Sequence, residues 1–141
     1  MAYCTRQDMV DRFGEQELID LTDRGTPPLG IIDSAVLDGA ISDASAEIDG
    51  YLAGRYELPL ASVPSVLKRI ACDLARYHLY DDAASEHVAK RYDDAIRFLR
   101  AVGRGEISLG VDAAGAEPQV VNGAEVQSGG RVFSRDDDGY I

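Results

Sequence analysis

Two histidines, His78 and His87, are the side chains of this sequence best suited to act as a general base near neutral pH. A nucleophilic mechanism would combine such a histidine with a serine or cysteine and an orienting acid. The spacing of apolar residues places His78 on the apolar side of a helix, which predicts a hydrogen-bonded core or interface histidine. His87 falls in the first turn of the next predicted helix and is expected to be solvated. We therefore predict that neither histidine is catalytic and that the chain is not an enzyme.

Carboxylates are abundant, with 25 Asp and Glu residues, but they follow no ligand pattern. No segment has the alternating oxygen ligands and central glycine of a calcium loop, and the acidic run at 136–138 is typical of a solvated terminus. The cysteines, Cys4 and Cys72, are far apart and lack a CxxC pair, so they predict free thiols rather than a zinc site or a disulfide. The glycine-containing segments at 103–105 and 128–130 do not join a strand to a helix, as a phosphate-binding loop would. We expect no metal, nucleotide or other cofactor.

The net charge of −11 arises because only 14 Lys and Arg oppose the acidic residues. A surface this negative repels phosphate backbones and disfavours tight binding of nucleic acid. Arg97, Arg100 and Arg104 lie along one predicted helix and its exit, where pairing with nearby acids and the helix dipole is favoured over a phosphate contact. The sequence has no run of about 20 apolar residues, and its start lacks the order of a signal peptide, so we expect no membrane partner.

Capping residues and apolar spacing together predict an all-α fold. Thr5 can begin a first helix, which Gly14 ends. Apolar side chains at 3.6-residue spacing mark the core-facing sides of the longer helices. The expected helices cover 5–13, 15–22, 34–54, 65–80 and 86–103, the third capped by Asp33 or Ser34 and the fifth beginning near Ser85. We predict a compact bundle of about four to five helices with an extended C-terminal arm.

The helix at 65–80 is expected to be the central one. Its apolar residues, with Ile70 and Leu74 near the middle, cover most of its circumference, which is the pattern of a helix buried on most sides. A narrow polar strip remains along it, formed by Arg69, Asp73, Arg76 and Tyr80.

The composition changes after residue 110 and divides the chain into a helical body at 1–110 and a flexible linker with an assembly arm at 111–141. The linker is rich in Gly, Ala, Ser and Asn, which cannot supply a hydrophobic core. A patterned segment returns near the end and is suited to dock on a partner by adding a strand to a sheet edge. The predicted partner-binding residues of this arm are Arg131, Val132, Phe133, Ser134, Arg135, Tyr140 and Ile141.

Segments spread along most of the chain carry a resemblance to one family. The longest are 17–24 (ELIDLTDR), 41–53 (ISDASAEIDGYLA), 71–77 (ACDLARY) and 105–110 (GEISLG). Shorter ones are 55–56, 58–60, 79–80, 91–95, 98–99 and 133–136. In this order they resemble the Mu-like phage and prophage neck family of head-to-tail adaptor proteins, also called head-completion or connector proteins.

This resemblance implies a virion protein of the phage neck that resides in the host cytoplasm during assembly. Proteins of this class are small helical bundles that form a ring, commonly of twelve copies, below the portal of a tailed phage. The implied partners are further copies of the chain, the portal protein and a tail-side neck or tail-terminator protein. DNA is expected to pass through the ring without tight binding.

Two other classes of function compete with a structural ring subunit. A small helical DNA- or protein-binding regulator would need a recognition helix rich in Arg, Lys, Asn or Gln, whereas the best candidate, 86–103, has mixed charge and an apolar stripe. A small hydrolase would need a triad, metal or cofactor signature, which the sequence lacks. The sequence therefore favours the ring subunit.

Overall fold

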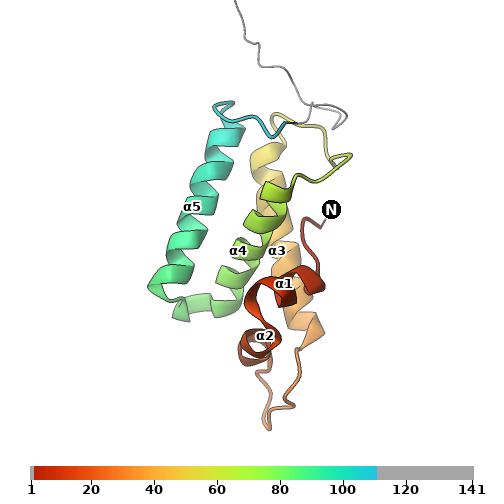
Figure 1. The fold of residues 1–141 in the computed structure, drawn as a ribbon, viewed down its shortest axis with the longest axis vertical. Coiled ribbons are helices and arrows are strands. Elements are labelled where there is room, and N and C mark those ends of the chain that lie inside the picture. The colour runs from red at the N-terminus through yellow and green to blue at the C-terminus, as the bar shows by residue number, and fades with distance from the viewer. Residues whose placement is uncertain (1, 111–141) are drawn as a thin grey trace, which may run out of the picture.

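The chain forms an all-α body in the computed structural model, which describes residues 2–110 (Figure 1). Its elements are α1 (Arg6–Phe13), α2 (Glu15–Thr22), α3 (Ser34–Leu52), α4 (Ser65–Tyr80), the short 3₁₀ turn η1 (Asp81–Ala83) and α5 (Glu86–Gly103). No strand occurs between residues 2 and 110. The predicted fold class is confirmed, and the arm predicted at 111–141 lies outside the described residues.

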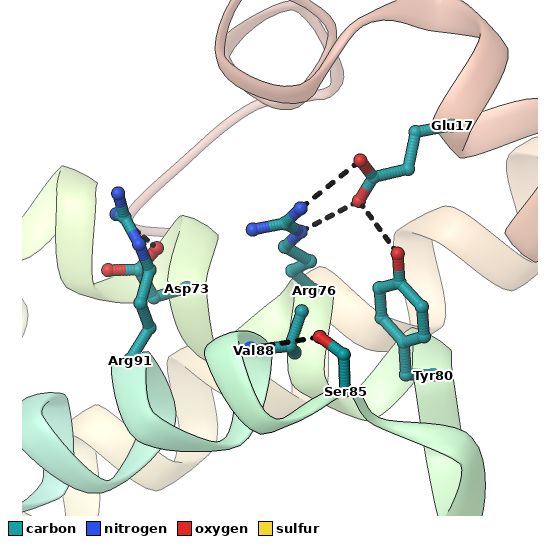
Figure 2. A network of polar contacts seen from close by, with 7 residues as sticks. All are labelled: Glu17, Asp73, Arg76, Tyr80, Ser85, Val88 and Arg91. Carbon is teal, nitrogen blue, oxygen red and sulfur yellow. Dashed lines mark hydrogen bonds and ion pairs between the residues drawn. The ribbon is translucent and has the colours of Figure 1, made fainter.

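The helix boundaries follow from local capping chemistry. Thr5 and Asp8 form a reciprocal cap at the start of α1: the Thr5 hydroxyl accepts from the Asp8 backbone N–H at 3.1 Å, and the Asp8 carboxylate accepts from the Thr5 N–H at 2.9 Å. Gly14 ends α1 at a φ of +89°, a conformation that glycine adopts without steric cost. Asp33 caps α3, and Ser85 caps α5 by accepting from the Val88 N–H (Figure 2). The Thr5 cap predicted for α1 is confirmed, Asp33 is the one of the two predicted residues that caps α3, and α5 begins next to Ser85 as predicted.

Helices α3, α4 and α5 pack side by side, while α1 and α2 lie across α3 and α4 (Figure 1). Helix α4 contacts each of the other four α-helices, and half of its residues are buried. Ile70 and Leu74 are fully buried in the core. The central position predicted for the 65–80 helix is thereby confirmed.

The carboxyl ends of α3 and α5 meet closely. Helix α3 ends at Leu52 rather than near residue 54, and the chain then turns. At Gly103 a Cβ atom would lie 3.0 Å from the backbone carbonyl oxygen of Tyr51, so only glycine fits there without a shift. The Arg55 side chain donates to the carbonyl oxygen of Val102 at 2.9 Å and places a cation at the negative end of α5. This hydrogen bond ties the segment that follows α3 to the last turn of α5.

Candidate assembly surfaces

The partner-binding residues predicted from the sequence all belong to the arm. Arg131, Val132, Phe133, Ser134, Arg135, Tyr140 and Ile141 lie outside the described residues, so the structure neither gathers nor separates them. The candidate surfaces within residues 2–110 are a loop and a groove, which the sequence patterns did not mark.

The loop between α2 and α3 presents two large apolar side chains to solvent. Leu29 is 74% exposed and Ile31 is 60% exposed. Figure 1 shows this loop projecting from the helical body at the end away from the C-terminus of α5. Exposed apolar side chains that gather at one site mark contact surfaces more often than single scattered ones do. We call this feature the apolar loop, residues 23–33.

Buried and charged side chains hold the apolar loop in one shape. The carboxylate of Asp23 accepts from the backbone N–H groups of Leu29 at 3.1 Å and Gly30 at 2.7 Å. The buried hydroxyl of Thr22 donates to the Leu18 carbonyl oxygen at 2.7 Å and accepts from the Asp33 N–H at 2.9 Å. The loop is thus bonded at its base and at its tip, and its apolar residues are displayed by a fixed backbone.

A groove of about 700 Å³ lies between the N-terminal segment and α3. Its lining includes the apolar side chains of Cys4, Ile41 and Ala46. On its rim Arg6 binds Asp38 through two hydrogen bonds, of 2.8 and 2.6 Å. This guanidinium holds the pKa of the Asp38 carboxyl below its ordinary value. We call this feature the N-terminal groove.

The second acid of the N-terminal groove, Asp49, is also partnered, because it accepts a hydrogen bond from the Tyr3 hydroxyl. Burial and this hydrogen bond raise the pKa of Tyr3. The backbone N–H of Tyr3 donates to Ser45 on α3 at 3.2 Å, so the segment that forms one wall of the groove is fastened to the helix that forms the other. Both acids on the rim are thus engaged within the chain.

Three residues of the polar strip predicted on α4, Asp73, Arg76 and Tyr80, make contacts with other helices (Figure 2), whereas Arg69 is exposed. Arg76 points at Glu17 of α2 and binds both of its carboxylate oxygens, at 2.7 and 3.1 Å, while the guanidinium lies over the Phe13 ring. The Tyr80 hydroxyl donates to the same carboxylate at 3.3 Å. These contacts fasten α2 to α4 and have a structural role.

Asp73 departs most from the predicted polar strip, because it is only 2% exposed. It lies 3.5 Å from the guanidinium groups of both Arg69 and Arg91, the latter reaching across from α5 (Figure 2). Burial raises the pKa of Asp73, and the two guanidinium groups oppose that rise. The sequence could not show this burial, since it depends on where α5 packs.

His78 is hydrogen-bonded as predicted. Its Nε2 lies 3.0 Å from Glu47 on α3, and the Tyr92 hydroxyl of α5 donates to the other oxygen of that carboxylate at 2.8 Å. Tyr92 also stacks on Tyr77, with ring centroids 3.9 Å apart. The Glu47 carboxylate thus joins α3 to α4 and α5. His87 is exposed, in agreement with the sequence prediction.

The cations of α5 pair with nearby acids, which confirms the local pairing predicted for two of the three arginines. Asp94 accepts from both Lys90 and Arg97, at 3.1 and 2.9 Å, and Arg104 binds Glu106 at 2.7 Å. Arg100 lines a pocket together with Tyr51, Tyr92 and Arg97.

The two cysteines, far apart in sequence, come together in the core. Cys4 and Cys72 are both buried free thiols, as the sequence predicted for their redox state. Contact with the Cys72 thiol, together with burial, raises the pKa of Cys4. A thiol of raised pKa is a poor nucleophile, and the pair contributes to packing.

Between residues 2 and 110, no helix is both long and apolar enough to cross a membrane. No group of three or more His, Cys, Asp or Glu side chains is gathered there in a way that could hold a metal ion.

Known proteins match this chain over nearly its whole length. The family model described as "Bacteriophage Mu, Gp36" matches residues 3–128. The Mu-like prophage FluMu protein gp36 of Haemophilus influenzae is 38% identical over 133 residues, which cover 94% of this chain and 93% of the relative. Gene product J of Escherichia phage Mu is 39% identical over 142 residues and is covered, like this chain, over its full length.

Proposed function

The chain belongs to the bacteriophage Mu Gp36 family, and from this premise we propose that it is a structural subunit of the phage neck, the connector that joins head to tail. In this proposal several copies form a ring below the portal, and DNA passes through the ring. Its partners are further copies of itself, the portal protein and a tail-side neck or tail-terminator protein. The protein would act in the virion after assembly in the host cytoplasm.

The observation that carries the proposal is the rigid display of apolar side chains on the body of a Mu-like phage protein. Leu29 and Ile31 are exposed on a loop whose backbone is held by hydrogen bonds. A folded body that keeps such residues in solvent is suited to permanent contact with protein partners. The net charge of −11 supports the same proposal, because a conduit for DNA works best with a wall that does not hold it.

A DNA-binding regulator is not favoured by these observations. Its recognition helix would be α5, but most cations of that helix and its exit are already paired: Lys90 and Arg97 with Asp94, Arg91 with Asp73, and Arg104 with Glu106. Binding to a DNA backbone would have to break these pairs against the repulsion of a strongly acidic chain. Submicromolar affinity for random duplex at physiological salt would reverse this preference.

Deletion of the gene from the encoding phage or prophage tests the proposal. Without a neck subunit, induced cells should accumulate filled heads and separate tails, seen by electron microscopy, and infectious particles should be lost. Supplying the wild-type chain from a plasmid should restore them. Normal joining of heads and tails without the chain would exclude the proposal.

A further inference from the structure

The central part of the apolar loop, residues 25–32, is an uncharged knob. Residues 25–32 contain no ionisable side chain, and the two large hydrophobic residues that are well exposed between residues 2 and 110 both belong to it. Asp23 and Thr22 fix the backbone of the loop, so little conformational freedom would be lost when it enters a partner. Its partner surface should therefore be concave, apolar and free of unpaired charge.

The N-terminal groove has these properties. Cys4, Ile41 and Ala46 give it apolar lining. Two contacts within the chain already engage its acids: Arg6 forms an ion pair with Asp38, and the Asp49 carboxylate accepts a hydrogen bond from the Tyr3 hydroxyl. An uncharged insert need not break either contact, whereas a basic insert such as the segment at 131–135 would compete with Arg6 for Asp38 and with Tyr3 for Asp49. The apolar lining and these internal contacts favour the uncharged loop over the arm as the occupant.

The loop cannot be the occupant of its own groove in this fold. No residue of 23–33 lines the groove within the described part of the chain. The knob and the groove are two separate sites on the same subunit, so each copy can donate one and accept the other. This arrangement defines a heterologous contact, which closes into a ring when the rotation between neighbours permits.

We infer that Leu29 and Ile31 of one copy insert into the N-terminal groove of the next, and that this contact joins neighbouring subunits. The inference rests on the proposed function, since it gives the ring a specific interface. It identifies the partner of the loop as a second copy of this chain and the contact residues on α3 as those near Ala46.

Photo-cross-linking in assembled phage particles tests this contact directly. A benzophenone amino acid replaces Ile31 in the full-length chain, and particles are irradiated, purified and analysed by mass spectrometry. The inference predicts covalent dimers whose cross-links lie within 2–7 or 38–49 of the second copy. Links only to the segment at 131–141, links only to another protein, or the absence of dimers would each overturn it.

A matched pair of variants sharpens the test. Ala46→Trp fills the groove, whereas Ala83→Trp places the same side chain on an exposed residue of η1 that does not line the groove. The cross-linked dimer should be lost in the first variant and retained in the second. Equal yields in the two would overturn the inference, and thermal unfolding of each purified variant checks that both are folded.

Mixing gives a second, independent measurement. A loop variant, Leu29→Ser with Ile31→Ser, and the groove variant Ala46→Trp each lose one half of the contact. A heterologous contact predicts that a mixture of the two forms one-to-one dimers and nothing larger, because a single intact knob meets a single intact groove. Rings formed by either variant alone, or a mixture that gives no dimer, would count against the inference.

The outcomes separate this inference from the proposed function. If the chain is present in particles and needed to join heads to tails, but the cross-links lie outside the groove, only the interface is wrong. If the chain is absent from particles, the proposed function fails as well.

Discussion

The interior around α4 and the surface made by the apolar loop use the same residue types in opposite ways. Ile70 and Leu74 are fully buried between four other helices, whereas Leu29 and Ile31 are held in solvent. Hydrogen bonds and ion pairs in the interior fasten the helices to one another, and those of Asp23 fix the backbone of the loop that carries Leu29 and Ile31. The first region buries its apolar side chains in the core, whereas the second leaves Leu29 and Ile31 exposed and available for the contact proposed above.

This difference predicts that substitutions in the two regions separate stability from assembly. Changes around α4 should lower the free energy of unfolding, and changes in the loop, groove or arm should lower association while leaving that free energy almost unchanged.

Leu74→Ala should have the largest effect. Leu74 is fully buried on the central helix, so the change removes buried apolar atoms and leaves a cavity. The expected loss is about 2–5 kcal/mol of unfolding free energy, measured by urea denaturation followed by circular dichroism. An unchanged midpoint would show that α4 is not the centre of the core.

Gly103→Ala tests the close approach of α5 to α3. An added Cβ would meet the backbone carbonyl oxygen of Tyr51 at 3.0 Å, and a backbone atom cannot move away easily. Overpacking of this kind costs about 1–3 kcal/mol, against which alanine gains about 1 kcal/mol in helix propensity. We expect a net loss of up to about 2 kcal/mol in thermal or urea unfolding.

Gly50→Ala is the matched control, because it lies in α3 with no atom within 4 Å of the added Cβ. There the helix propensity acts alone, and the variant should be more stable than the parent by up to about 1 kcal/mol. If both glycine variants shift the midpoint in the same direction, the close contact at Tyr51 is not what Gly103 provides.

The helices could be predicted from the sequence because the residues that begin and end them act locally. Thr5, Gly14 and Ser85 mark helix ends through contacts with residues three or four positions away, so no tertiary information is needed. The burial of Asp73 and the meeting of Cys4 with Cys72 depend on how distant helices pack, and no spacing rule contains that information.

The candidate surfaces were harder to predict for the same reason. Leu29 and Ile31 follow two prolines outside any helical period, and their types alone do not show whether a loop folds onto the core. Ile32, the next residue, does pack against it. The N-terminal groove exists only because the first residues lie along α3, some 40 positions further on.

Thr5→Ala should lower the free energy of unfolding by about 1 kcal/mol, less than Leu74→Ala does. The substitution removes one half of the cap at the start of α1. The cap also gives stability a dependence on pH. Slight burial acts to raise the pKa of Asp8, but the hydrogen bonds from Thr5 outweigh it and lower that pKa. A carboxylate with a lowered folded-state pKa stabilises the fold above its unfolded-state pKa and stops doing so as the pH falls through the lower value.

Asp8→Asn therefore provides the test of that pH dependence. The parent should be more stable than this variant near neutral pH, and the difference should shrink as the pH is lowered below the ordinary Asp value of 3.8. Thermal unfolding of both proteins between neutral and acidic pH measures it. A difference that does not change with pH would mean that the ionised carboxylate is not what the cap uses.

Deleting 128–141 should have the smallest effect on stability and a large effect on assembly. The core of Ile70, Leu74 and their neighbours is formed by side chains of residues 2–110, so we expect the thermal midpoint of the body to remain close to that of the parent. The sequence of the deleted part alternates apolar and charged residues around Phe133, which suits a strand added to a partner.

We therefore expect the truncated protein to lose ring or portal association, and Phe133→Ala to weaken that association more than Asp137→Ala does. Sedimentation and native mass spectrometry with purified portal protein measure both, and a truncated chain that unfolds, or that assembles as well as the parent, would contradict the assignment of an assembly arm. Combined with the loop variant, the deletion also tells the two contacts apart: loss at the apolar loop should affect only the joining of copies to one another, whereas loss at the arm should also affect their joining to the portal.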